Sequence, residues 1–252
     1  MLYEKIYAII LAAGKGKRMK SELPKVLHKL RGQALINWVL DTVIDLSVER
    51  TIVVVGFGRD LVLEHIHCYY DIEKVQFAVQ EEMLGTADAV KQALPLLPDS
   101  GTVLVLCGDV PFLTSRTLSR LLICHRDTGA AATLLTAMAE VPTGYGRVVR
   151  SSDDGSVLRV VEQQDASVEE TAIREINSGT YVFELFPLRE AISLVKNVNA
   201  QSEYYLTDVI HILRRQGNRI SALVAESPWE VEGINSSEQL EALNQKFKRW
   251  YS

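Results

Sequence analysis

The chain has 252 residues, of which 47% are hydrophobic and 23% are charged, and this composition suits one large α/β domain with a substantial core. Its 27 basic residues are outnumbered by 32 acidic ones, which argues against a nucleic-acid-binding surface. No run approaches the about 18 consecutive apolar residues of a membrane span, so we expect neither a nucleic acid nor a membrane as a partner.

The first half of the chain alternates predicted strands with predicted helices. Apolar, β-branched runs predict buried strands at residues 6–11, 51–55, 75–79 and 102–106. Helical spacing or composition predicts helices at residues 36–44, 60–68, 85–94 and 118–125. Repeated βα units predict the α/β class, with a Rossmann-like, mostly parallel sheet flanked by helices on both faces. Such sheets bind ligands beyond the carboxyl ends of their strands.

The pattern changes from about Thr133, where shorter strands and polar turns such as residues 151–155 predict a smaller, mixed α/β lobe. Ser236 and Gln239 fit a capping box, and the following Leu240, Leu243 and Phe247 form one apolar stripe. We therefore expect a C-terminal helix over residues 236–252.

The cysteines and histidines do not predict a disulfide or a metal site. Cys68, Cys107 and Cys124 are odd in number and form no CxxC pair, so we expect free thiols and a cytoplasmic location. His65 and His67 are two residues apart on a predicted helix and would face different ways. The sequence makes no prediction of oligomeric state.

A glycine-containing loop follows the first predicted strand, in the sequence Leu-Ala-Ala-Gly-Lys-Gly-Lys-Arg-Met at residues 11–19. Glycines at a strand end allow backbone N–H groups to surround phosphates. Seven basic residues and one acid lie between Lys15 and Arg31, which favours a polyphosphate ligand. The dinucleotide-binding pattern would need a third glycine where Met19 stands, and the Walker pattern does not fit the sequence around Arg18. The second glycine pair, Gly56 and Gly58, is interpreted as a structural strand-to-helix turn.

The loop and Pro24-Lys25 resemble the signature of sugar-1-phosphate nucleotidyltransferases. Further segments follow in the family's order: Gln80 with residues 84–87, residues 108–111, 144–147, 161–162, 175–179, 203–208 and 230–235. Together they are most similar to the bacterial uridylyltransferase (pyrophosphorylase) domains that make UDP-N-acetylglucosamine.

The resemblance implies transfer of a uridylyl group from UTP to N-acetylglucosamine 1-phosphate, releasing pyrophosphate, with Mg²⁺ as cofactor. It implies one domain over residues 1–235, with a nucleotide-binding half over about 1–130 and a sugar-binding half over about 131–235. The alternatives are the same chemistry with glucose 1-phosphate, another sugar phosphate or another base, and a non-catalytic sugar-nucleotide sensor.

The resemblance also implies roles for individual residues. Arg18 and Lys25 would be catalytic cations at the phosphates, and Asp109 and Asn235 would be the ligands of Mg²⁺. Without the resemblance, Arg18 and Lys25 are compatible with solvated charges, Asp109 with a turn residue and Asn235 with a helix cap. The implied nucleotide-binding residues are Leu11, Ala12, Ala13, Gly14, Gln80, Gly85, Thr86 and Gly108, with Gln80, Gly85 and Thr86 reading the uracil edge. The implied sugar-binding residues are Gly144, Glu162, Asn177 and Thr207.

Four positions depart from the family pattern. Lys17 and Ser178 stand where threonine is usual, Cys107 replaces a frequent tyrosine, and Asp88 stands where histidine is common. None of the four removes a predicted phosphate or metal ligand.

Overall fold

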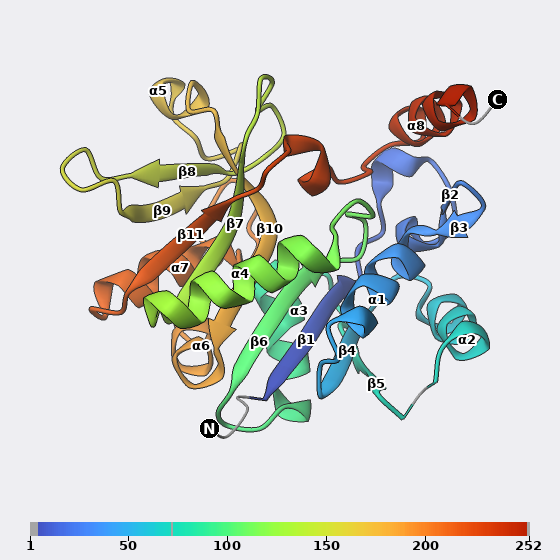
Figure 1. Ribbon diagram of the computed structural model, residues 1–252, viewed down its shortest axis with the longest axis horizontal. Coiled ribbons are helices and arrows are strands. Elements are labelled where there is room, and N and C mark those ends of the chain that lie inside the picture. Colours follow the sequence, from blue (N-terminus) through green and yellow to red (C-terminus); the bar gives the residue numbers. More distant parts are fainter. Residues whose placement is uncertain (1–4, 72, 251–252) are drawn as a thin grey trace.

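The computed structural model of the protein describes residues 5–71 and 73–250, with side chains up to residue 245. Within these ranges, one nine-stranded sheet has the order β11-β7-β10-β6-β1-β4-β5, with β8 and β9 attached beside β10 (Figure 1). Its strands are β1 (Ile6–Ala12), β4 (Arg50–Val55), β5 (Val75–Val79), β6 (Thr102–Cys107), β7 (Ala132–Met138), β8 (Arg147–Arg150), β9 (Val157–Val161), β10 (Glu175–Glu184) and β11 (Ile220–Val224). A short hairpin joins β2 (Lys29–Leu30) to β3 (Gln33–Ala34).

The first half of the chain confirms the predicted parallel sheet. β1 pairs in parallel with β4 and β6, and β4 pairs in parallel with β5. The predicted strands and helices all occur, with ends that differ by a few residues. The helices are α1 (Leu35–Asp45), α2 (Arg59–Tyr69), α3 (Thr86–Ala93), α4 (Ser115–Thr128), α5 (Val168–Thr171), α6 (Leu185–Ile192), α7 (Thr207–Arg215) and α8 (Ser237–Trp250).

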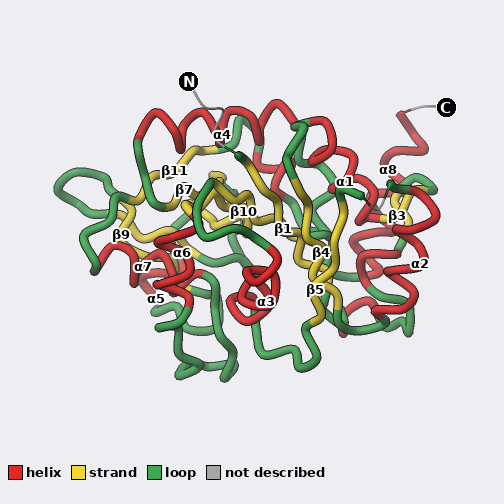
Figure 2. Tube along the Cα trace, turned by 90° about the horizontal axis from the view of Figure 1, so that it is seen from below, coloured by secondary structure: helices red, strands yellow, loops and turns green. Residues whose placement is uncertain are grey.

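Helices cover both faces of the sheet, as predicted. Alternate residues of β1 point to opposite faces, so Tyr7 and Ile9 join one buried cluster while Ala8 and Ile10 join the other. The first cluster contains side chains of α3, α6 and α7, and the second contains those of α1, α2 and α4. Figure 2 shows α1 and α4 on one side of the strands and α3 and α6 on the other.

The second half of the chain extends the same sheet. The antiparallel strand β10 lies between β6 and β7, and its pairing with β7 shifts register between Asn177 and Tyr181. This irregularity lies beside the end of β6 and turns that part of β10 into one wall of a cavity. The smaller lobe, formed by β8, β9 and α5, projects from this side (Figure 1).

The C-terminal segment returns from β11 across the sheet to the β2–β3 hairpin, where α8 lies (Figure 1). The predicted capping box is confirmed, because the Ser236 N–H donates to Gln239 Oε1 and the Gln239 N–H donates to Ser236 Oγ. Leu240 is buried, whereas the side chain of Phe247 and residues 251–252 lie outside the described residues. Asn244 fixes the helix to the hairpin by donating to the Lys29 carbonyl.

Two further sequence predictions concern the molecule as a whole. Cys68, Cys107 and Cys124 are free thiols, as expected. Among residues 5–71 and 73–250, no helix combines the length and the apolar character needed to span a bilayer.

Candidate active site

The loop after β1 presents its backbone at the carboxyl edge of the sheet. Ala12 and Ala13 are buried, whereas Gly14 is exposed, and a Cβ added to Gly14 would meet no atom within 4 Å. The turn after β4 supports the loop, because the Phe57 N–H donates to the Ala13 carbonyl over 2.9 Å. Gly58 of the same turn begins α2, which confirms the structural interpretation of the second glycine pair.

Gly16 makes room for the side chain of Lys25. Gly16 has a φ of +63°, and a Cβ on it would lie 2.6 Å from Lys25 Cβ. Any other residue at position 16 would therefore carry backbone strain and also displace Lys25. The loop's second glycine and the lysine of the following Pro-Lys pair act as one structural unit.

Lys25 joins two residues that are far apart in the sequence. Its ammonium forms an ion pair with the carboxylate of Asp109, just beyond β6, and donates to Asn235 Oδ1 over 2.8 Å. The Ile234 N–H donates to the Asp109 carbonyl over 3.0 Å, which fixes the C-terminal segment beside the end of β6. The predicted metal ligands are thus brought together.

The same contacts test whether these residues suit a divalent cation. The ammonium of Lys25 is a cation that oxygens of Asp109 and Asn235 already share. In the described part of the chain, no group of three or more His, Cys, Asp or Glu side chains forms a complete metal cage. Mg²⁺ usually takes one or two protein oxygens and completes its shell with phosphates and water, so the pair fits Mg²⁺ bound with a phosphate ligand.

Gln80, Gly85 and Thr86 lie at the opposite end of the loop region. Gln80 follows β5 and is only 4% exposed, and its Nε2 donates to the Gly85 carbonyl over 3.0 Å. The segment around Tyr204 holds this loop, since the Tyr204 N–H donates to Leu84 and the Tyr204 carbonyl accepts from the Ala87 N–H. Gly85 has a φ of +117°, and a Cβ on it would lie 2.5 Å from the Tyr204 carbonyl oxygen.

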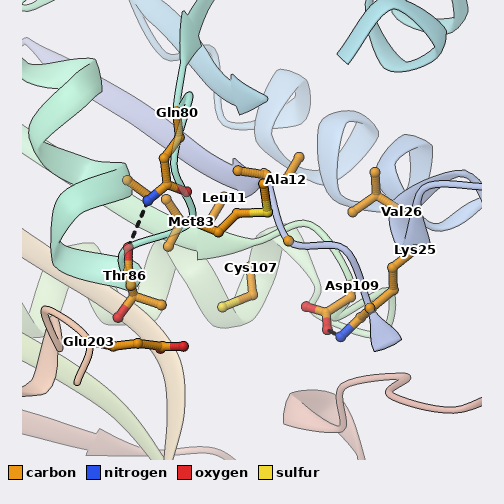
Figure 3. A pocket seen from close by; sticks show the side chains of 15 residues that line it. Leu11, Ala12, Lys25, Val26, Gln80, Met83, Thr86, Cys107, Asp109 and Glu203 are labelled. Atoms are coloured by element: carbon orange, nitrogen blue, oxygen red, sulfur yellow. Dashed lines mark hydrogen bonds and ion pairs between the residues drawn. The ribbon is translucent and has the colours of Figure 1, made fainter. Parts of the chain in front are cut away.

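These elements surround a cavity of about 280 Å³. Figure 3 shows Gln80 and Thr86 at one end, Lys25 and Asp109 at the other, and Leu11, Ala12 and Cys107 between them. The complete lining is Leu11, Ala12, Ala13, Gly14, Gly16, Lys25, Val26, Gln80, Met83, Gly85, Thr86, Ala89, Cys107, Asp109 and Glu203.

The predicted sugar-binding residues line a second cavity, of about 180 Å³. Thr207 donates to Glu162 Oε1 over 3.0 Å, and Asn177 Nδ2 lies 2.6 Å from the Tyr181 hydroxyl oxygen, which accepts its hydrogen bond. Gly144 lies at the rim, where its N–H donates to Gln163 Oε1. All four predicted residues, Gly144, Glu162, Asn177 and Thr207, line this one cavity.

The two cavities adjoin, because Leu11, Thr86 and Cys107 line both. Burial raises the pKa of the Cys107 thiol to about 12, so the group that faces both cavities is neutral at physiological pH. Burial also raises the pKa of Glu162, opposed by the hydrogen bond from Thr207. Tyr181 is buried with its pKa raised well above its ordinary value, and it therefore stays a neutral phenol.

Three predicted residues lie outside the two linings. Arg18 belongs to the short 3₁₀ turn Lys17–Met19 and is exposed, as is Lys17. Gly108 packs beneath the site and its N–H donates to the Leu11 carbonyl over 2.9 Å. Asn235 reaches the first cavity only through Lys25.

The two linings also contain residues that the sequence did not assign, among them Met83, Glu203 and Tyr181. Met83 and Glu203 line the first cavity, and Tyr181 lines the second. Glu203 belongs to the family segment at residues 203–208, which indicated that this region lies near the site. Met83 lies in a loop with no periodic pattern, so nothing in the sequence indicated its position. Tyr181 follows the register shift in β10 and had no signal beyond an apolar strand.

The fold is that of a Rossmann-like α/β protein with adjoining cavities at the carboxyl edge of its parallel strands. A family model described as Nucleotidyl transferase matches residues 7–237. The chain therefore belongs to the nucleotidyl transferase family, as the sequence motifs predicted.

Curated relatives match this chain at about 50% identity over about half of their own length. It is 50% identical to the bifunctional protein GlmU of Geobacillus thermodenitrificans over 232 residues, covering 92% of this chain and 49% of that protein. It is 49% identical to the bifunctional protein GlmU of Brevibacillus brevis over 237 residues, covering 94% and 50%. The chain thus spans about half the length of these relatives.

A solved structure confirms the fold. The crystal structure of a UDP-glucose pyrophosphorylase complexed with UDP-glucose superposes with a TM-score of 0.74 over 98% of this chain and 99% of that chain, at 15% sequence identity.

Proposed function

We propose that the protein transfers a uridylyl group from UTP to N-acetylglucosamine 1-phosphate, forming UDP-N-acetylglucosamine and pyrophosphate. The observation that carries the proposal is the junction of the two cavities at Leu11, Thr86 and Cys107. A nucleotide in the first cavity and a sugar phosphate in the second would have their phosphates near one another. Family membership supports the reaction class, and the motifs quoted above support this base and this sugar.

In the proposed reaction, an oxygen of the sugar phosphate attacks the α-phosphorus of UTP in line. A new P–O bond forms while the bond to the β-phosphate oxygen breaks, and pyrophosphate leaves. This chemistry depends on positioning and on neutralising phosphate charge. The exposed backbone at Gly14 supports close approach of the triphosphate, and the cations Lys25 and Arg18 would neutralise its charge.

We propose Mg²⁺ as the cofactor, held by Asp109 and Asn235. Bound there with the triphosphate, it would neutralise charge that develops on the phosphate oxygens. Lys25 already contacts both side chains, and its flexible stem gives the ammonium access to the first cavity that it lines. Asp109 and Asn235 would thus orient Lys25 as well as hold the metal.

The second cavity suits a pyranose with hydroxyl and amide groups. Glu162 can accept hydrogen bonds from sugar hydroxyls, and Thr207 fixes its carboxylate. The Asn177 amide is held by the Tyr181 hydroxyl, so its orientation is set before a sugar binds. We propose the corresponding division of the domain, in which residues up to about 130 bind the nucleotide and residues from about 131 to 235 bind the sugar, with Glu203 and Asn235 as exceptions on the nucleotide side.

UTP, a sugar phosphate and three free thiols are consistent with a cytoplasmic location, which we propose as well. The test of the activity is pyrophosphate release with Mg²⁺, measured across UTP, CTP, ATP and GTP against N-acetylglucosamine 1-phosphate and glucose 1-phosphate. We expect UTP with N-acetylglucosamine 1-phosphate to give the highest kcat/KM. A maximum at another pair would contradict the substrate assignment, and binding without release would favour a sugar-nucleotide sensor.

A further inference from the structure

Asp88 contacts Gln80, the residue that the resemblance implies reads the base. It lies in the first turn of α3 and does not line the first cavity. Its Oδ2 accepts a hydrogen bond from Gln80 Nε2 over 2.8 Å. Its Oδ1 accepts from Gln92 Nε2 over 3.1 Å, so the carboxylate is held at both oxygens.

The side-chain amide of Gln80 is therefore oriented. An amide nitrogen has two N–H donors, and here they point to Asp88 Oδ2 and to the Gly85 carbonyl, 3.0 Å away. Both partners accept hydrogen bonds, and the carboxylate adds negative charge. Turning the amide over would place Gln80 Oε1 against these two oxygens, losing two hydrogen bonds, one of them charge-assisted.

This orientation leaves an acceptor at the cavity. No described residue donates to Gln80 Oε1, and Gln80 lines the first cavity. Figure 3 shows the amide nitrogen of Gln80 directed to the loop at Thr86 and the amide oxygen on the side of Leu11 and Ala12.

A fixed acceptor distinguishes pyrimidines at ring position N3. Uracil carries an N3–H that can donate to Gln80 Oε1, whereas neutral cytosine presents an N3 lone pair. With cytosine, the lone pairs of Gln80 Oε1 would face the lone pair of the ring N3, unless the amide turned over. The free-energy cost of turning the amide then contributes to the preference for uracil.

We infer that Asp88 is a positioning residue for base specificity: its carboxylate holds the Gln80 amide with the oxygen toward the nucleotide, and so favours uracil over cytosine. The inference rests on the proposed function, in that the nucleotide base occupies the Gln80 end of the first cavity. It gives a specificity role to a residue that lies outside the lining of the first cavity.

The experiment is isothermal titration calorimetry of the whole chain with Mg²⁺-UTP and with Mg²⁺-CTP. Asp88→Ala removes the carboxylate, and we expect it to reduce the CTP-to-UTP ratio of dissociation constants about tenfold, the effect of losing one charge-assisted hydrogen bond. Asp88→Asn keeps an oxygen acceptor for Gln80 and should restore most of the ratio. Lys91→Ala on the same helix is the matched control and should leave the ratio unchanged.

The outcomes separate this inference from the proposed function. An unchanged ratio in Asp88→Ala, or equal weakening of both nucleotides, would overturn the role of Asp88 and leave the proposed function standing. Equal binding of UTP and CTP by the unaltered protein would contradict both. A ratio that falls in Asp88→Ala, in a protein that fails to form UDP-N-acetylglucosamine, would support the role of Asp88 and contradict the proposed reaction.

Discussion

Replacing Gly85 with alanine tests how the loop around Gly85, which we propose binds the base, is held against the segment around Tyr204. Gly85 has a φ of +117° and a ψ of 176°, a conformation that alanine adopts only at a cost of about 1–3 kcal/mol. The new Cβ would lie 2.5 Å from the Tyr204 carbonyl oxygen, so the segment must move. Two backbone hydrogen bonds, from Tyr204 to Leu84 and from Ala87 to Tyr204, would weaken by about 1 kcal/mol each.

The expected loss for Gly85→Ala is therefore about 3–5 kcal/mol of unfolding free energy, together with a raised KM for UTP. Gly217→Ala is the matched control, because Gly217 has a φ of +83° but an added Cβ there would meet nothing within 4 Å. Only backbone strain of about 1–2 kcal/mol should result in the control, with KM unchanged.

Urea unfolding and steady-state kinetics of both variants measure the two effects. The difference in unfolding free energy between them should be about 2 kcal/mol, the sum for the two weakened hydrogen bonds, when the backbone strain of the two variants is similar. Equal losses in the two variants, or an unaltered KM for UTP in Gly85→Ala, would refute this view of the loop.

Three further predictions concern the charged residues. Asp109→Ala should lower kcat about a thousandfold or more, equivalent to about 4 kcal/mol, because the proposed metal loses its carboxylate ligand. Pyrophosphate-release assays at saturating Mg²⁺ measure this effect, and near-normal turnover would contradict Asp109 as a metal ligand. Lys17→Thr should raise KM for UTP and leave kcat unchanged or higher, and the rise in KM should shrink as salt is added because salt screens the ammonium. A large fall in kcat at constant KM would show instead that Lys17 acts in the transition state. Burial raises the pKa of Glu162, so the stability given by its neutral form is fully present below the unfolded-state pKa and is lost as pH rises through the raised pKa. Glu162→Gln should therefore be more stable than the unaltered protein at neutral pH, with a gain in stability that shrinks on acidification, and it should have a higher KM for the sugar phosphate. Urea unfolding from neutral to acidic pH measures the first effect, and steady-state kinetics measure the second. A gain in stability that grows on acidification would contradict the raised pKa of Glu162.

The sequence predicted the parallel half of the fold well, because its strands are buried on both faces. A strand such as residues 102–106 is apolar throughout, and the repeated βα pattern then places the loop at Gly14 and the acid Asp109 at the same edge. The pairing of β10 between β6 and β7 was not predicted, because antiparallel pairing between distant segments leaves no local pattern.

Most residues that line the two cavities at positions marked by family motifs were predicted, whereas contacts that depend on the tertiary structure were missed. Lys25 and Asn235 are 210 residues apart, so spacing alone cannot bring them together; the path of the C-terminal segment past Asp109 does so. The contact between Asp88 and Gln80 joins a helix to the end of a strand, and the sequence did not predict it either. Without the resemblance, the sequence indicates only a phosphate-binding loop and one acid.

The most direct test of the proposed reaction follows the phosphorus atoms of UTP. UTP labelled at the α-phosphate and UTP labelled at the γ-phosphate are each incubated with the protein, N-acetylglucosamine 1-phosphate and Mg²⁺, and the products are separated. We predict that the α-label appears in UDP-N-acetylglucosamine and the γ-label in pyrophosphate, in equal amounts. Release of the γ-label as orthophosphate, or retention of both labels in UTP, would contradict the proposed uridylyl transfer.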